Sequence, residues 1–159
     1  RILDRLKLKK IIVVSSAPQI RYPDCYGIDM ARLGDFIAFK AAISLLKKSD
    51  SGKTIIQTTY KKCKEDQINN KESQVNHLKN IYAPFTQEEI SEEIAGLLKT
   101  DNISTDFDIL FQTKECLREA CPNHTGDWYF TGNYPTNGGN RIANRSFIYY
   151  IEGNDSRAY

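Results

Sequence analysis

The chain has 159 residues, enough for one domain with a hydrophobic core, and its composition of 40% hydrophobic and 26% charged residues is typical of globular proteins. The formal net charge of +2 and the scattered Lys and Arg argue against nucleic acid or an anionic membrane as an obligatory partner. No apolar stretch approaches the ~20 residues of a membrane span and no secretory signal is present, so we expect a cytoplasmic protein.

The N-terminal part of the sequence predicts a helix followed by one buried strand. Residues 1–8 have the apolar spacing of an amphipathic helix, and the unbroken β-branched run 11–15 is typical of a strand buried on both faces. A loop rich in Pro, Gly, Ser and aromatic residues follows the strand. Because no similar strand is found elsewhere, and the chain opens inside a helix, we expect a fragment whose partner strands come from elsewhere.

The middle of the sequence predicts helices. Residues 31–48 carry a wide apolar face, whereas 54–64 and 75–82 carry thin apolar stripes on either side of a polar connection, 65–73. Thr86 and Glu89 match a capping box that opens a further helix. The residues expected on the buried face of that helix are Ile90, Ile94, Leu97 and Leu98.

The C-terminal part mixes both kinds of element. The spacing predicts a strand at 107–111, a helix at 114–120 capped by Thr113, a β-prone aromatic segment at 127–132 and a helix at 141–151. The sequence therefore indicates an α/β fold that is mostly helical, with about six helices and two or three short strands.

Candidate chemistry is sparse, and no residue of the chain is expected to be catalytic. Ser15, Ser16 and Arg21 follow the carboxyl end of a strand, where open α/β sheets bind ligands, so they are candidate substrate-binding residues. In the alternative interpretation the small residues only turn the chain and Arg21 pairs locally. Cys116, Cys121 and His124 lack the paired C-x2-C spacing of zinc sites, so we expect buried reduced thiols and no metal.

Three stretches carry a resemblance to a known family. They are Val13–Met30, Ile109–Gln112 and Trp128–Thr136. In this order they resemble the C-terminal part of the glutamine phosphoribosylpyrophosphate (PRPP) amidotransferases, or amidophosphoribosyltransferases. The first stretch is long and specific, and the other two are short.

The resemblance implies a fold and a role. Residues 1–50 would be the tail end of a type I phosphoribosyltransferase-like domain, and residues 51–159 a helical C-terminal extension. The parent enzyme would make 5-phosphoribosylamine from PRPP and glutamine at the start of purine synthesis. The family's glutaminase nucleophile and PRPP loop have no match in the chain, so the fragment alone would be inactive.

The resemblance also bears on cofactors and partners. The family uses Mg²⁺ with PRPP, and some members bind an iron–sulfur cluster through cysteines. The matching positions are Asp24, Gly126 and Tyr129, so no cluster is expected. The implied partners are the upstream part of the same polypeptide and further copies in a homo-oligomer.

Two other readings remain open at the level of sequence. The chain could be a stand-alone, non-catalytic helical interaction domain, which would pair its own strands and cover them. It could also be a small nucleotide-binding regulator, which would depend on Ser15, Ser16 and Arg21 alone.

Overall fold

The computed structural model describes residues 7–25, 30–69, 75–99, 105–124 and 126–158. These residues form seven α-helices, one short 3-10 helix and two β-strands, an α/β arrangement dominated by helices. The expected helix at 1–8 lies almost wholly outside the described residues. Within the described residues, no helix is both long and apolar enough to cross a membrane.

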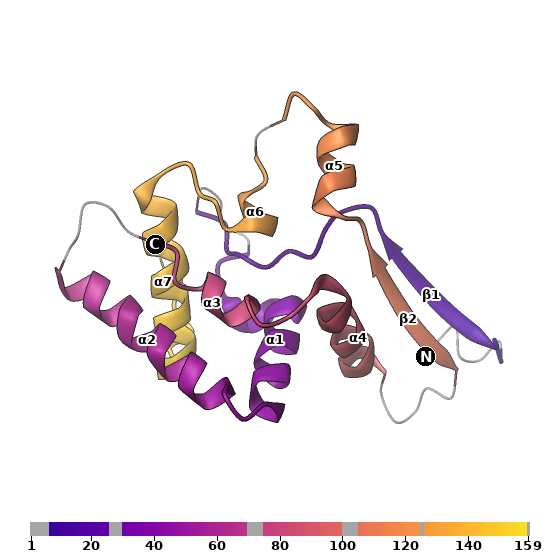
Figure 1. Cartoon of the computed structure of the whole chain (residues 1–159), viewed down its shortest axis with the longest axis horizontal. Helices are drawn as coiled ribbons and strands as arrows, with labels where there is room; N and C mark the ends of the chain where they lie inside the picture. Colours follow the sequence, from indigo (N-terminus) through magenta and orange to yellow (C-terminus); the bar gives the residue numbers. More distant parts are fainter. Residues whose placement is uncertain (1–6, 26–29, 70–74, 100–104, 125, 159) are drawn as a thin grey trace.

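The core is built around helix α1 (Ile37–Lys48), which contacts η2 (Leu33–Asp35), α2 (Gly52–Asn69), α3 (Lys79–Tyr82) and α4 (Gln87–Leu98). Helix α7 (Asn137–Glu152) packs beside α2 (Figure 1). Phe39 of α1 meets the rings of Phe147 and Tyr150 edge-on. The core therefore joins residues on both sides of the domain boundary expected at residue 50, and that division remains a prediction.

Strands β1 (Lys10–Ser15) and β2 (Asp106–Phe111) form a two-stranded parallel sheet in which Val13 lies opposite Ile109. The sheet lies at one end of the molecule, outside α4 (Figure 1). Helix α4 packs on β2, on the face that carries Ile109 and Phe111. Since parallel strands need a crossover, α1 to α4 all lie between the two strands in the sequence.

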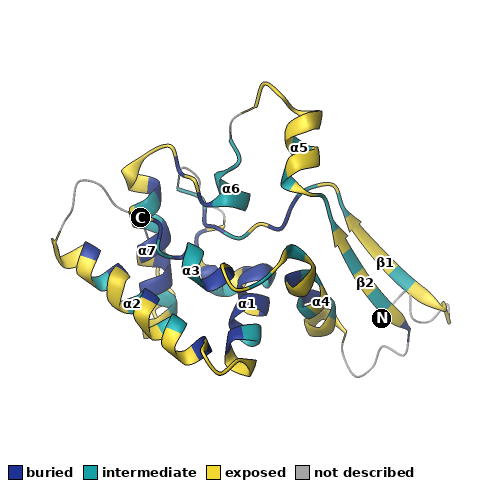
Figure 2. Ribbon diagram, viewed as in Figure 1, coloured by how far each residue is buried: buried dark blue, intermediate teal, exposed yellow. Residues whose placement is uncertain are grey.

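The prediction that β1 is buried on both faces is wrong for this chain. Most of the strand is exposed, as Figure 2 shows, and Val14 reaches 72% exposure. The reason is that the sheet has only two strands in the described residues and one covering helix, which lies against β2. The apolar run does form a strand, but within the described part of the chain it pairs on one edge alone, with β2.

Helix starts follow capping chemistry closely. Thr86 accepts a hydrogen bond from the Glu89 amide while the Glu89 carboxylate accepts one from the Thr86 amide, so the predicted capping box is confirmed. Thr113 caps α5 (Lys114–Ala120) as expected. Thr136 caps α7 in the same way, which starts that helix four residues earlier than predicted.

Other expectations required correction. The aromatic segment predicted as β-prone is a single helical turn, α6 (Trp128–Thr131). Helix α2 extends to Asn69, into the polar connection, while α3 occupies only the end of the helix expected at 75–82. Leu97 and Leu98 are about half exposed rather than buried, because no described element covers the end of α4.

Candidate functional site

The segment after β1 borders a cavity at the carboxyl ends of both strands. The cavity has a volume of about 400 Å³ and lies between residues 15–20, the start of α1 and Phe111. This is the edge of the sheet at which open α/β folds place ligands. Its walls are mainly apolar, formed by Pro18, Ile20, Met30, Phe36 and Phe111 among others.

Two of the three predicted binding residues lie near this cavity. Ser15 lines it, but its hydroxyl donates to the Ala17 carbonyl at 2.9 Å and accepts from the Ala17 amide at 3.3 Å. The Ser15 hydroxyl therefore holds the turn after β1. Ser16 is exposed next to it.

Arg21, the third predicted residue, is directed into the protein. Its Nε and Nη2 donate to Oε1 of Gln19 at 3.1 and 2.7 Å, and its guanidinium lies 5.4 Å from the centre of the Tyr82 ring. Burial lowers the pKa of Arg21. The structure thus brings Ser15 to the cavity and places Arg21 in a packing role.

Gln19 holds this segment against α4, a role that sequence reasoning missed. The side chain is 2% exposed, and its Nε2 donates to the Gln87 carbonyl at 2.9 Å and to the Ser91 hydroxyl at 2.8 Å. With two bonds accepted from Arg21, the Gln19 amide uses both its donors and its acceptor. A Gln in a loop gives no sequence signal for such burial, since the partners lie about 70 residues away.

The second half of the segment meets the aromatic stretch around α6, and we call this contact the loop–α6 junction (residues 21–25 with 128–134). The Arg21 and Tyr22 amides donate to the Tyr129 carbonyl at 2.9 and 3.1 Å. The Tyr134 hydroxyl donates to the Pro23 carbonyl at 2.5 Å. The junction therefore joins parts of the chain that are more than 100 residues apart.

Tyrosines at this junction are strongly shifted. Burial raises the pKa of Tyr22 to about 12 and raises the pKa of Tyr134 further. The pKa of fully buried Tyr82 is also raised, and its hydroxyl donates to the Arg21 carbonyl at 2.6 Å. All three phenols stay protonated near neutral pH, so they supply no general base there. The hydroxyls of Tyr82 and Tyr134 act instead as donors that fix the backbone.

Two of the three positions matched to cluster ligands, Asp24 and Tyr129, are in contact. The pKa of Tyr129 is raised by burial, and further by the charge of Asp24 and a hydrogen bond with its carboxylate. The phenol of Tyr129 and the carboxylate of Asp24 therefore occupy positions at which the cluster-binding relatives would have cysteine thiolates. Cys25 is half-buried beside Tyr134.

The other cysteines and histidines lie elsewhere. Cys116 and Cys121 are exposed, so the expectation of buried thiols is wrong for them. Cys121 and His124 line a surface pocket of about 290 Å³ beside the Arg118–Asp127 ion pair. His77 is mostly buried, with Nε2 2.9 Å from the Asp66 carboxylate. Among the described residues, no three metal-ligating side chains cluster.

Comparisons with protein-family models, with curated proteins and with solved structures found no match to this chain.

Proposed function

We propose that this chain is the C-terminal part of an amidophosphoribosyltransferase, the enzyme that forms 5-phosphoribosylamine from PRPP and glutamine. One observation carries the proposal: the three stretches that resemble the family contact one another. Strand β1 of the first stretch pairs with β2, and the Gln112 amide of the second donates to the Ser15 carbonyl at 3.1 Å. Residues 21–25 of the first stretch meet residues 129–134 of the third.

The convergence supports the proposal because chance matches scattered over a chain have no reason to meet. Residues of the first and third stretches that meet have satisfied backbone groups and tight packing. In proteins that share a fold, positions in such contacts tolerate few residue types, so their sequences stay similar on both sides of the junction.

The role proposed for this chain is structural support of a phosphoribosyltransferase-like domain. Its tail end would be residues 1–50, followed by a helical extension, and the uncovered β1 would continue into strands of the upstream polypeptide. The parent enzyme would supply the glutaminase nucleophile and the PRPP loop, with Mg²⁺ accompanying PRPP. We propose a cytoplasmic homo-oligomer of the cluster-free type, given the Tyr129–Asp24 contact.

A chimera tests this proposal. The chain replaces the corresponding C-terminal part of an authentic amidophosphoribosyltransferase, in a bacterial strain that lacks the enzyme and requires purine. We expect growth without purine, and we expect the purified 159-residue chain alone to consume no PRPP. A soluble, folded chimera that fails to support growth contradicts the proposal, as does PRPP consumption by the chain alone.

A second candidate is a stand-alone helical interaction domain without catalytic activity. Pairing of β1 with β2 inside the chain favours it, because an independent module must pair its own strands. The exposed apolar side chains of β1 favour the first proposal instead. The chimera separates the two, since an unrelated interaction domain has no means of completing the enzyme.

A further inference from the structure

Strand β1 has a free edge within the described part of the chain. The Gln112 amide donates to the Ser15 carbonyl, so the backbone groups of Ser15 face β2. Since backbone groups alternate in direction along a strand, those of Val13 also face β2, whereas those of Ile12 and Val14 face away from it. The described residues contain no strand on that side. The outer edge of β1 therefore presents amides and carbonyls with which another strand can pair.

The sequence of β1 does not protect this edge. Proteins commonly protect a free edge with a proline, a bulge or a charge within the strand. The run Ile11–Val14 contains neither proline nor charge, and the exposed fractions of Ile12 and Val14 are 52% and 72%. The nearest charges on the strand side are Lys9 and Lys10, which precede the run. Such an edge is a template for pairing with a second chain.

The edge is also accessible to a partner as large as a second copy of this chain. Strand β1 lies at the outer side of the sheet, away from the helices (Figure 1), and α4 packs on β2. Strands lie about 4.8 Å apart, so joining two copies through β1 separates their β2 strands, and the α4 helices on them, by about 14 Å. Because packed helices need only about 8–10 Å, the two helices do not collide.

The strand is complementary to an antiparallel copy of itself. With a twofold axis at Val13, the apolar run overlaps its own copy, and Ile12 of one chain lies opposite Val14 of the other. Both residues direct their backbone groups to this edge, so each such pair exchanges both of its hydrogen bonds. The same register places Lys10 opposite Ser16 of the second copy, whereas a parallel arrangement would bring the lysines of the two copies together.

Pairing also joins exposed apolar side chains. Ile12 and Val14 lie on the same face of the sheet as Leu110, which is 55% exposed. In the antiparallel arrangement each Ile12 side chain lies beside the Val14 side chain of the second copy, a cross-strand apolar contact. A sheet of two strands has little stability of its own, so doubling the number of strands stabilises it.

We propose that the 159-residue chain forms a symmetric dimer in which two β1 strands pair antiparallel about Val13 and join the two sheets into one. The contact uses the same residues on both copies, so it closes at two chains. The proposal goes beyond the proposed function, because it concerns how this chain associates on its own, and the growth of the chimera does not depend on it.

Analytical ultracentrifugation of the purified chain tests the dimer. We expect the dimer fraction to rise between about 1 µM and about 200 µM. Val14→Pro removes an amide on the free edge and none that faces β2, so it should weaken dimerisation about tenfold or more. Val14→Thr keeps that amide and the β-branched shape, so it should change the dissociation constant less than about threefold. Circular dichroism checks that both variants fold.

Cysteine trapping locates the axis. Val13→Cys places two thiols opposite each other, at the Cα separation of about 4.5 Å that a non-hydrogen-bonded pair has, which a disulfide can bridge. Ile12→Cys is the matched control, because its two copies lie on a diagonal about 8 Å apart, beyond the span of a disulfide. With Cys116 and Cys121 replaced by Ser, we expect the linked dimer of Val13→Cys to form about ten times faster or more under mild oxidation. Exposure alone would favour the control, since Ile12 is 52% exposed and Val13 40%.

Three results would overturn the proposal. A chain that stays monomeric at every concentration would leave the edge to a strand of another polypeptide. Trapping at equal rates, or faster trapping at position 12, would exclude the antiparallel register about Val13. A folded Val14→Pro variant that dimerises as well as the unchanged chain would place the dimer contact on another surface. If Val14→Pro does not fold, the trapping comparison decides.

Discussion

At the scale of single residues, two polar side chains hold the loop after β1 in place. Gln19 links the loop after β1 to α4, and Arg21 fills the acceptor of Gln19 while it covers the Tyr82 ring. A buried amide with all partners satisfied stabilises one arrangement and disfavours others, since each lost partner leaves an unpaired group. The same reasoning explains why Arg21 is not free to meet a ligand.

Gly132 is the residue at which backbone conformation matters most. It ends α6 with a φ of 69°, and a Cβ there would lie 2.7 Å from Nδ2 of Asn76 and 2.8 Å from the Tyr22 ring. We expect Gly132→Ala to lower the free energy of unfolding by about 3 kcal/mol, from left-handed strain plus overpacking. Urea denaturation measures the loss.

Gly153 provides the matched control for that substitution. It also ends a helix, α7, with a φ of 66°, but no atom of the described residues lies within 4 Å of the position that a Cβ would take there. Gly153→Ala should therefore cost only the backbone strain, about 1 kcal/mol. Equal losses for the two variants would show that the close packing around Gly132 contributes nothing.

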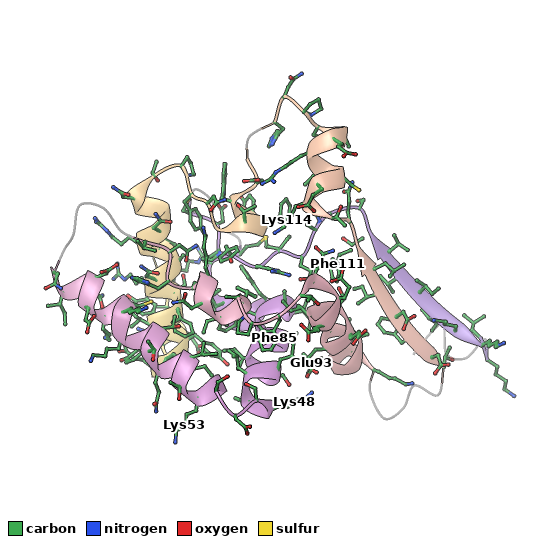
Figure 3. The ribbon with its side chains drawn as sticks, viewed as in Figure 1. Lys48, Lys53, Phe85, Glu93, Phe111 and Lys114 are labelled. Carbon is green, nitrogen blue, oxygen red and sulfur yellow. The ribbon has the colours of Figure 1, made fainter. Side chains whose placement is uncertain are left out.

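At the scale of elements, α1 and α4 are joined by both apolar and charged contacts. Ile90 and Ile94 are fully buried in the core. Glu93 of α4 lies near Lys48 of α1, and both are labelled in Figure 3. The Glu93 carboxylate accepts from Lys48 Nζ at 2.6 and 2.8 Å and from the Ser44 hydroxyl at 2.6 Å. This carboxylate is mostly buried, unlike the exposed Lys48.

Glu93 gives an acid-sensitive prediction. Hydrogen bonds from Lys48 and then Ser44 lower its pKa below the ordinary 4.5. Its stabilisation is therefore complete above pH 4.5 and is lost as the pH falls through the lowered value. We expect Glu93→Gln to cost about 1 kcal/mol at pH 7 and progressively less as the pH falls below 4.5 toward pH 2, measured by chemical denaturation.

Glu92 provides the control for that substitution. It is exposed on the same helix, so Glu92→Gln should change stability by less than about 0.5 kcal/mol at either pH. A Glu93→Gln loss that stays constant from pH 7 down to pH 2 would contradict a contribution that depends on the ionised carboxylate of Glu93.

At the scale of the whole molecule, the helices enclose a core around α1 while the sheet lies at one end and remains largely open (Figure 2). The buried core contains several acidic groups that stay protonated in the folded state. Burial raises the pKa of the Cys63 thiol from 9.0 to about 12, with a smaller contribution from Asp66. Burial likewise raises the pKa of Tyr22 to about 12.

These raised pKa values predict alkaline instability. The folded state holds the protons more tightly than the unfolded state, so their stabilisation is complete below about pH 9 and is lost as the pH rises toward 12. We expect the melting temperature to fall by about 5 °C or more between pH 8 and pH 10.5. Cys63→Ala should raise the pH at which the melting temperature begins to fall by about one unit, toward the ordinary pKa of Tyr. If that pH is unchanged, Cys63 does not contribute to the alkaline instability.

Local chemistry was readable from the sequence. The Thr86–Glu89 capping box, the Thr113 cap and the strand at 107–111 involve neighbours a few residues apart, so spacing alone indicates them. The α/β class and the predominance of helices follow from the same periodicities. The pairing partner of β1 was not readable in this way, since β2 lies almost 100 residues further along.

Tertiary contacts decided the rest. The aromatic segment 128–131 forms a helical turn, and its Tyr129 carbonyl receives the amides of Arg21 and Tyr22, a long-range contact that the β-propensity of the side chains does not indicate. Arg21 turned inward because Gln19 and Tyr82 surround it. Strand β1 stayed exposed because β2 is its pairing partner among the described strands and α4 packs on β2 instead. Residue types and their spacing thus determine the local structure. Burial depends on which distant segments pack against a residue, and this is not encoded near that residue in the sequence.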